Sequence, residues 1–172
     1  MGSMAKPSEA ARCPGCGLKL PSSGQPIDSQ FRSSAECRQI YDELSAYTLS
    51  LADAAFPHQF VVGAYSAQHV SEDAKPIRTV FALVGLYLAC ERGFTGKQVQ
   101  RAHTLLADRK CEWPRFEPSG ARGSLTVLDP LQAQRGLERD KAIRAWSSSV
   151  WHAWSHAREA VVALVQERLD RR

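Results

Sequence analysis

The chain has 172 residues, of which 44% are hydrophobic and 23% are charged, a composition that suits a folded protein and excludes extensive disorder. A core of this size fits one domain. The net charge of +4 is a small excess, and basic residues stand beside acidic ones along helical stretches, which favours solvated helix faces over nucleic-acid binding.

The N-terminus and the cysteines indicate the cellular setting. No apolar run approaches the roughly 18 residues of a membrane span, and no signal-peptide pattern is present, so we expect a cytoplasmic protein without membrane contact. Five cysteines, an odd number, predict reduced thiols or metal ligands instead of a disulfide framework. Residues 1–11, which start with the tag-like MGSM, are expected to be disordered, and residues 12–172 to form a single helical domain.

Residues 12–32 begin with RCPGCGL, which is typical of a zinc knuckle. Glycine and proline around a C-x-x-C turn let Cys13 and Cys16 point their sulfurs at one place, and Zn²⁺ takes four ligands in a tetrahedron. Redox catalysis by this pair is disfavoured, because no βαβ pattern surrounds it. The segment therefore predicts a zinc knuckle followed by a loop.

Residues 33–109 are predicted to contain four helices. Ser33 and Glu36 fit a capping box at the start of the first, and Cys37 then opens a stripe of apolar residues at helical spacing. Proline at a first turn and threonine at an N-cap mark two later starts. The later helices are expected over 58–69, from Pro76 to about Gly93, and from Thr95 onward.

The second half of the chain reads as one loop and one helix. Residues 110–136 are dense in proline and glycine, which predicts a long loop with a short strand at SLTVL. Residues 137–170 carry a broad apolar face and are predicted to form one long helix. Helices with almost no strand pattern predict an all-α fold, a helical bundle with the N-terminal zinc knuckle as an appendage.

The remaining ligands of the zinc site can be predicted from helix geometry. Cys37 lies in the first turn of a helix, where the partial positive charge of unpaired N–H groups favours a thiolate. If the first two helices form an antiparallel hairpin, a rise of about 1.5 Å per residue returns His69 toward Cys37 and leaves His58 at the far end. We therefore predict Cys13, Cys16, Cys37 and His69 as ligands of Zn²⁺, with His58 as the substitute.

A second group of histidines occurs in WHAWSH. His152 and His156 are four residues apart on the predicted helix, and Glu159 follows three residues later, so one helix face could present an open metal site. The simpler interpretation, which we prefer, is that one histidine borders the core and the other is solvated, because no general-base motif accompanies them. His152 and His156 are therefore weaker ligand candidates than His69.

The segments CPGCGL, AYSAQH, GLYLACERG and WSSSVWHAWSHA together resemble a bacterial family of unknown function, from Cys13 to about Val162. Its CPxCG, YxxQH and VWxAW motifs are all present. The resemblance implies that this chain keeps the recurrent positions Cys13, Cys16, Cys37, His58, Tyr65, Gln68, His69, Trp146, Trp151, Trp154 and His156. It departs at Gly63, Val70 and Phe81, where the family has aspartate, proline and histidine. A polar or metal-binding pocket built on that aspartate and histidine would lack two contributors here.

Two functions are compatible with these patterns. The first is a zinc-binding helical protein with a structural Cys3His site that acts as a binding or scaffolding module, with a protein partner or a second copy of itself. The alternative is a metal-dependent enzyme with a second ion between helices, held by His58 and His156. The sequence contains no phosphate-binding glycine loop, no G-x-S-x-G and no paired carboxylates, so it identifies no reaction.

Overall fold

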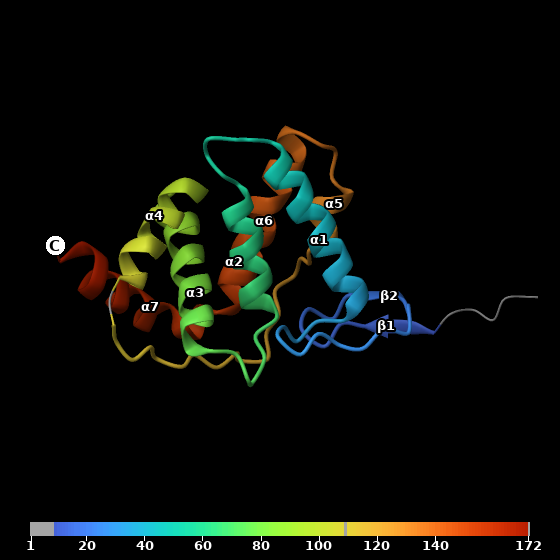
Figure 1. Ribbon diagram of the computed structural model, residues 1–172, viewed down its shortest axis with the longest axis horizontal. Coiled ribbons are helices and arrows are strands. Elements are labelled where there is room, and N and C mark those ends of the chain that lie inside the picture. The colour runs from blue at the N-terminus through green and yellow to red at the C-terminus, as the bar shows by residue number, and fades with distance from the viewer. Residues whose placement is uncertain (1–8, 109, 172) are drawn as a thin grey trace, which may run out of the picture.

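The computed structural model describes residues 9–108 and 110–171 and confirms an all-α fold with a small N-terminal appendage (Figure 1). Its helices are α1 (Ala35–Ser50), α2 (His58–Gln68), α3 (Pro76–Cys90), α4 (Gly96–Ala107), α5 (Leu128–Gln132), α6 (Leu137–Ala153) and α7 (Arg158–Val165). The appendage is an antiparallel hairpin of β1 (Ala10–Arg12) and β2 (Lys19–Pro21). Strand β1 contains Ala10 and Ala11, so the predicted disorder of residues 1–11 is wrong for these two residues. Residues 1–8 lie outside the described part of the chain.

Helix α1 starts one serine later than predicted. Ser34 is its N-cap, and the Ser34 hydroxyl accepts a hydrogen bond from the Cys37 N–H at 3.1 Å. The capping box of Ser33 and Glu36 is wrong, because the Glu36 carboxylate accepts from the backbone N–H and the hydroxyl of Ser23 at 2.6 and 2.8 Å. Glu36 therefore ties the segment after β2 to the first turn of α1.

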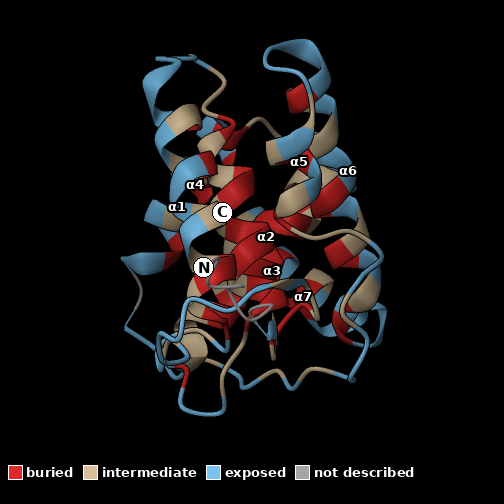
Figure 2. Ribbon diagram, turned by 90° about the vertical axis from the view of Figure 1, so that its right-hand side faces the viewer, coloured by how far each residue is buried: buried red, intermediate tan, exposed pale blue. Residues whose placement is uncertain are grey.

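Helix α2 lies at the centre of the bundle, where it contacts α1, α3, α4 and α6. Figure 2 shows α2 and α3 as mostly buried and the outer faces of α1 and α6 as exposed. The starts of α3 and α4 are as predicted: Pro76 occupies the first turn of α3, and Thr95 forms a capping box with Gln98. No helix in the described part of the chain combines the length and the apolar character that a membrane crossing requires.

The segment predicted as one long loop contains helix α5, and Ser124–Leu128 does not form the predicted strand. The buried Arg139 stabilises the end of α5, because its guanidinium donates to the carbonyls of Leu131 at 2.6 Å and Ala133 at 3.0 Å. A cation at a helix C-terminus meets the partial negative charge of unpaired carbonyls. At the start of α5 the Asp129 carboxylate accepts from the Thr126 N–H at 2.7 Å, so a local contact and the contact with Arg139 stabilise the two ends of this short helix.

The single long C-terminal helix predicted for residues 137–170 is interrupted. Helix α6 ends at Ala153, a 3-10 turn covers Ser155–Ala157, and a π-helical turn at Gln166–Asp170 follows α7. The interruption occurs where Trp154 leaves helical geometry and its indole N–H donates to the Ala67 carbonyl at 3.0 Å. Burial of this indole against α2 thus replaces a continuous helix with two.

Gln68 joins three segments that are far apart in the sequence. Its amide nitrogen donates to the carbonyls of Arg122 and Leu125 at 2.7 and 2.8 Å, and its oxygen accepts from the Trp146 indole at 3.0 Å. The side chain is only 3% exposed, so water cannot substitute for these partners. The long connection before α5 is therefore fixed to α2 and α6 through one amide.

We predict that Gln68→Ala lowers the free energy of unfolding by about 3 kcal/mol, because it leaves the buried Trp146 indole N–H and two partly buried carbonyls without their partner. Urea denaturation followed by tryptophan fluorescence measures the change. Gln132→Ala is the matched control: Gln132 is exposed on α5, and its loss should cost less than about 0.5 kcal/mol. Equal effects of the two substitutions would contradict the role given to Gln68.

Candidate metal centre

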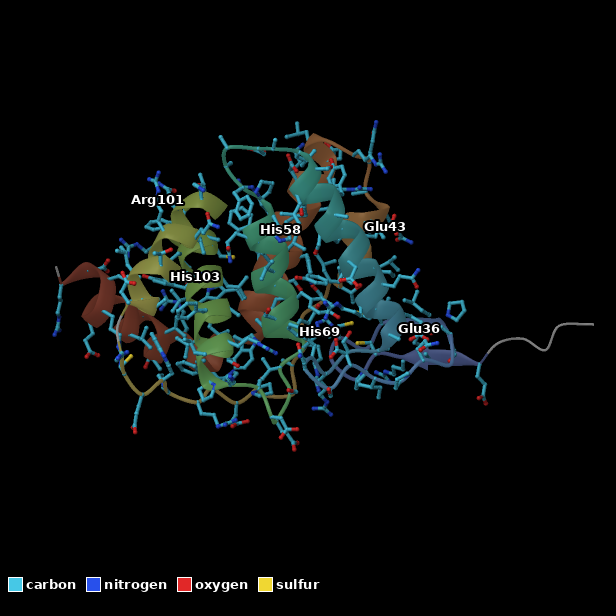
Figure 3. All side chains as sticks on the ribbon, in the orientation of Figure 1. Glu36, Glu43, His58, His69, Arg101 and His103 are labelled. Atoms are coloured by element: carbon cyan, nitrogen blue, oxygen red, sulfur yellow. The ribbon has the colours of Figure 1, made fainter. Side chains whose placement is uncertain are left out.

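Three separate segments bring Cys13, Cys16, Cys37 and His69 together. The first two lie in the turn between β1 and β2, Cys37 lies in the first turn of α1, and His69 is the C-cap of α2. One ligand atom from each of the four residues lies within 4.8 Å of all the others. In order, the residues are 1%, 8%, 0% and 0% exposed. Figure 3 shows His69 at the end of α2 that faces the hairpin.

Backbone hydrogen bonds shape the turn that carries the first two cysteines. The N–H of Cys13 donates to the Leu18 carbonyl at 2.8 Å, and the N–H of Gly17 donates to the Cys13 carbonyl at 2.9 Å. Gly17 has a φ of +80°, which favours glycine. The N–H groups of Cys16 and Leu18 also face the sulfurs of Cys13 and Cys16, where they stabilise negative charge.

Glycine is required at position 15 for a different reason: the backbone of Arg32 and the side chain of His69 lie too close to it to leave room for a Cβ. A Cβ at this position would overlap with the carbonyl oxygen of Arg32 and with the imidazole ring of His69. The backbone N–H of Arg32 in turn donates to the His69 carbonyl at 3.0 Å. The turn, the arm before α1 and the end of α2 are therefore packed against each other with no room for a side chain at Gly15.

The orientation of the His69 ring is fixed by α2 itself. Its Nδ1 lies 2.8 Å from the Tyr65 carbonyl, which can only accept, so Nδ1 carries the hydrogen and donates it. Nε2 therefore keeps its lone pair, and it lies 3.5 Å from the sulfur of Cys37. A histidine held by a backbone carbonyl on one nitrogen and free on the other is the usual arrangement of a metal ligand.

Tyr65 supports this histidine, a role that the sequence analysis did not assign. Its ring stacks on His69 with a centroid distance of 4.1 Å and on Tyr41 at 4.0 Å. Its hydroxyl is hydrogen-bonded to the hydroxyl of Ser33, and burial raises the pKa of Tyr65, which keeps the phenol neutral. The signal was present in the sequence, because Tyr65 and His69 are four residues apart and so share one helix face.

Two distances within the group, both to the Cys37 sulfur, match those of a tetrahedral ion. With Zn–S bonds of ~2.3 Å and a Zn–N bond of ~2.05 Å, a tetrahedron places two sulfurs about 3.8 Å apart and a sulfur and nitrogen about 3.5 Å apart. The sulfurs of Cys16 and Cys37 are 3.7 Å apart, and the Cys37 sulfur lies 3.5 Å from His69 Nε2. The sulfur spacing is far beyond the ~2.05 Å of a disulfide bond.

The pKa values of the three cysteine thiols are shifted in different directions. The thiols of Cys16 and then Cys37 donate to the sulfur of Cys13 and lower its pKa. The bond to Cys13 raises the pKa of Cys16 to about 12, and bonds to Cys13 and Cys16 raise the pKa of Cys37. One thiolate is thus stabilised by two neighbouring protons. A divalent cation could replace those protons and hold all three sulfurs as thiolates.

His58 lies away from this group, at the other end of α2 (Figure 3). Its Nδ1 is 3.0 Å from the Thr48 hydroxyl, and partial burial lowers the pKa of its imidazole. His58 therefore links α2 to α1 and does not substitute for His69 as a ligand. This is the separation that the predicted hairpin requires, since the two histidines sit at opposite ends of one helix.

The structure does not bring His156 to His58. His156 Nε2 donates to the Glu117 carbonyl at 2.8 Å, and its ring stacks on Trp154 at 5.4 Å. Trp154 contacts Ala67 near the end of α2, about 14 Å along the helix from His58 at ~1.5 Å per residue. A single ion between these two histidines is excluded by this distance.

His152 is exposed and lines an open groove of about 640 Å³ with His156. The break at Ser155–Ala157 separates these residues from Glu159 on α7, so the predicted three-ligand face on one helix is not formed. Within residues 9–108 and 110–171, the Cys3His group is the only cluster of three or more potential ligands that could hold an ion.

The positions that depart from the family pattern pack without forming a polar pocket. A Cβ at the buried Gly63 would sit 3.9 Å from the Ala82 carbonyl on α3. Phe81 stacks on His103 with a centroid distance of 4.9 Å, and Val70 is half-buried after α2. Packing thus occupies the places where the resemblance implies an aspartate and a histidine.

Comparison with models of protein families gives a match over most of the chain. A family model described as "Family of unknown function (DUF5946)" matches residues 11–155. No curated protein and no solved structure matches the chain. The matched range includes all four residues of the Cys3His group and ends before α7.

We predict that Gly15→Ala lowers the free energy of unfolding by about 3 kcal/mol, because its Cβ overlaps with a backbone carbonyl and the His69 ring. Gly24→Ala is the control: it has open space around it and loses only about 1 kcal/mol through its φ of +74°. Urea denaturation gives both values. A cost for Gly15→Ala no larger than that of Gly24→Ala would contradict the close packing of the turn.

Proposed function

The chain belongs to the DUF5946 family, and we propose that it is a zinc-binding helical protein whose Cys3His centre has a structural role. One observation carries the proposal: four buried potential ligands lie within 4.8 Å of one another, and the Cys16–Cys37 and Cys37–His69 distances match edges of a zinc tetrahedron. The family supplies no activity, so the proposal rests on the chemistry of the site.

The number and burial of the ligands favour a structural ion over a catalytic one. Catalytic zinc sites keep a coordination position for water or substrate, whereas structural sites are closed by four protein ligands. Here four ligands are already present and each is at most 8% exposed, so a substrate has no approach to the ion. A role as a metal-dependent enzyme would need a second ion elsewhere.

The donor set favours zinc among the common ions. Thiolates are soft ligands that Mg²⁺ and Ca²⁺ avoid, and three sulfurs with one imidazole in a tetrahedron are typical of structural zinc. Reduced thiols are maintained in the cytoplasm, which is where we place the protein.

The proposed ion would join the N-terminal hairpin to the helices. A two-stranded hairpin is at best marginally stable alone, and each hydrogen bond that ties residues 9–34 to the helices contributes only about 1 kcal/mol. Structural zinc contributes an apparent ~10–16 kcal/mol in small zinc domains, about ten times the contribution of any one of these hydrogen bonds. The helical domain, with its hairpin held in place by the ion, would then serve as a binding or scaffolding module for a protein partner or a second copy of the chain.

We predict one zinc per chain in untagged protein, measured by elemental analysis. Cys13→Ser with Cys37→Ser should reduce the content below about 0.1 per chain, and His69→Ala should weaken zinc binding at least tenfold, because each loses a ligand of a closed tetrahedron. Cys111→Ser is the matched control, since this exposed cysteine lies outside the centre and its loss should leave one zinc bound.

The same measurement distinguishes the two proposed functions. Full zinc content in the double cysteine variant would refute the structural centre. Two metals per chain, with one lost in His156→Ala or His58→Ala, would favour the enzyme. A content of one metal ion per chain, unchanged in both histidine variants, supports the structural zinc centre.

A further inference from the structure

A second site lies at the opposite end of the bundle from the hairpin (Figure 1). It is a pocket of about 280 Å³ between the end of α3, one face of α4 and the π-helical turn Gln166–Asp170. Its apolar wall is formed by Leu88, Phe94, Ala102, Leu105 and Leu169, and its polar rim by Arg92, Gln98, Arg101 and Asp170. Pockets between helices with an apolar wall and few polar groups are common ligand sites.

The rim of this pocket carries more positive than negative charge. Arg92 pairs with both carboxylate oxygens of Asp170 at 3.0 Å, and its guanidinium also lies over the Phe94 ring. Arg101, labelled on α4 in Figure 3, forms no ion pair with the described residues, and Arg171 is exposed beside Asp170. The pocket is therefore lined by two guanidinium groups, those of Arg92 and Arg101, and by one carboxylate, that of Asp170, which favours an anionic ligand.

The end of the chain already presents the chemistry that such a pocket would recognise. Leu169 lines the apolar wall, and the next residue, Asp170, places its carboxylate on Arg92. Adjacent residues thus place an apolar group on the wall of the pocket and a carboxylate on its cationic rim. A free molecule of the same chemistry would have to compete with Asp170 for Arg92.

We propose that this pocket binds a linear alkanoate of about eight carbon atoms, with its chain along the apolar wall and its carboxylate on Arg92, and that Asp170 acts as an internal competitor. The length follows from the volume, because a chain methylene fills about as much space as a water molecule, ~30 Å³. The proposal concerns a site separate from the metal centre and does not depend on zinc binding.

Calorimetric titration of the full chain with octanoate tests this site. Asp170→Asn should tighten binding about threefold to fivefold, because it frees Arg92 from an exposed ion pair of modest strength. Arg92→Gln should weaken binding about tenfold by removing the charged donor. Octan-1-ol, which has the same chain without the charge, should bind at least tenfold more weakly than octanoate.

Two matched controls separate recognition from general effects. Glu167→Gln removes the same charge from the same turn but lines a different groove, so it should leave the affinity unchanged. Arg135→Gln removes an exposed arginine that lies over Tyr47, as Arg92 lies over Phe94, and should also have no effect. Circular dichroism of each variant confirms that the helices are retained.

Two results would overturn the proposal: equal affinity for octanoate and octan-1-ol, or no octanoate binding at millimolar concentration in Asp170→Asn. Amide chemical shifts locate the ligand independently. Shifts around Leu88, Phe94 and Ala102 support the pocket, and shifts confined to the groove that contains His152 contradict it.

Discussion

The meeting of four ligand atoms from three segments is the constraint on which the N-terminal half of the molecule depends. Cys13 and Cys16 belong to a hairpin that is too small to be stable alone, whereas Cys37 and His69 belong to helices with their own packing. The proposed ion, shared by both groups, would convert a weakly attached arm into a part of the fold. The absence of space for a Cβ at Gly15 is the steric consequence of that closeness.

Helix α2 connects this centre to the rest of the bundle through one short motif. Tyr65 and His69 share the helix face that meets the cysteines, while Gln68 is rotated by about 100° from its neighbour His69 and meets the long connection and Trp146. The spacing of the YxxQH motif therefore serves two purposes on one helix. It sets the ligand's ring orientation and it fixes a loop that has little regular structure of its own.

Helix periodicity was sufficient to predict the hairpin of α1 and α2, and hence the approach of His69 to Cys37, because helical rise is nearly invariant. Details set by tertiary contacts could not be predicted. Glu36 favoured Ser33 as the cap in the sequence, but Glu36 accepts from Ser23 and Ser33 contacts Tyr65, so Ser34 caps α1. The break at Trp154 has no proline or glycine to announce it, since burial of an indole causes it.

X-ray absorption spectroscopy at the zinc edge of the purified protein tests the Cys3His centre most directly, because it reads the ligand set without a substitution. Three sulfur neighbours at ~2.3 Å and one nitrogen neighbour at ~2.0 Å are the expected shell. A shell dominated by oxygen and nitrogen, or one with four sulfurs, would contradict a centre built from Cys13, Cys16, Cys37 and His69.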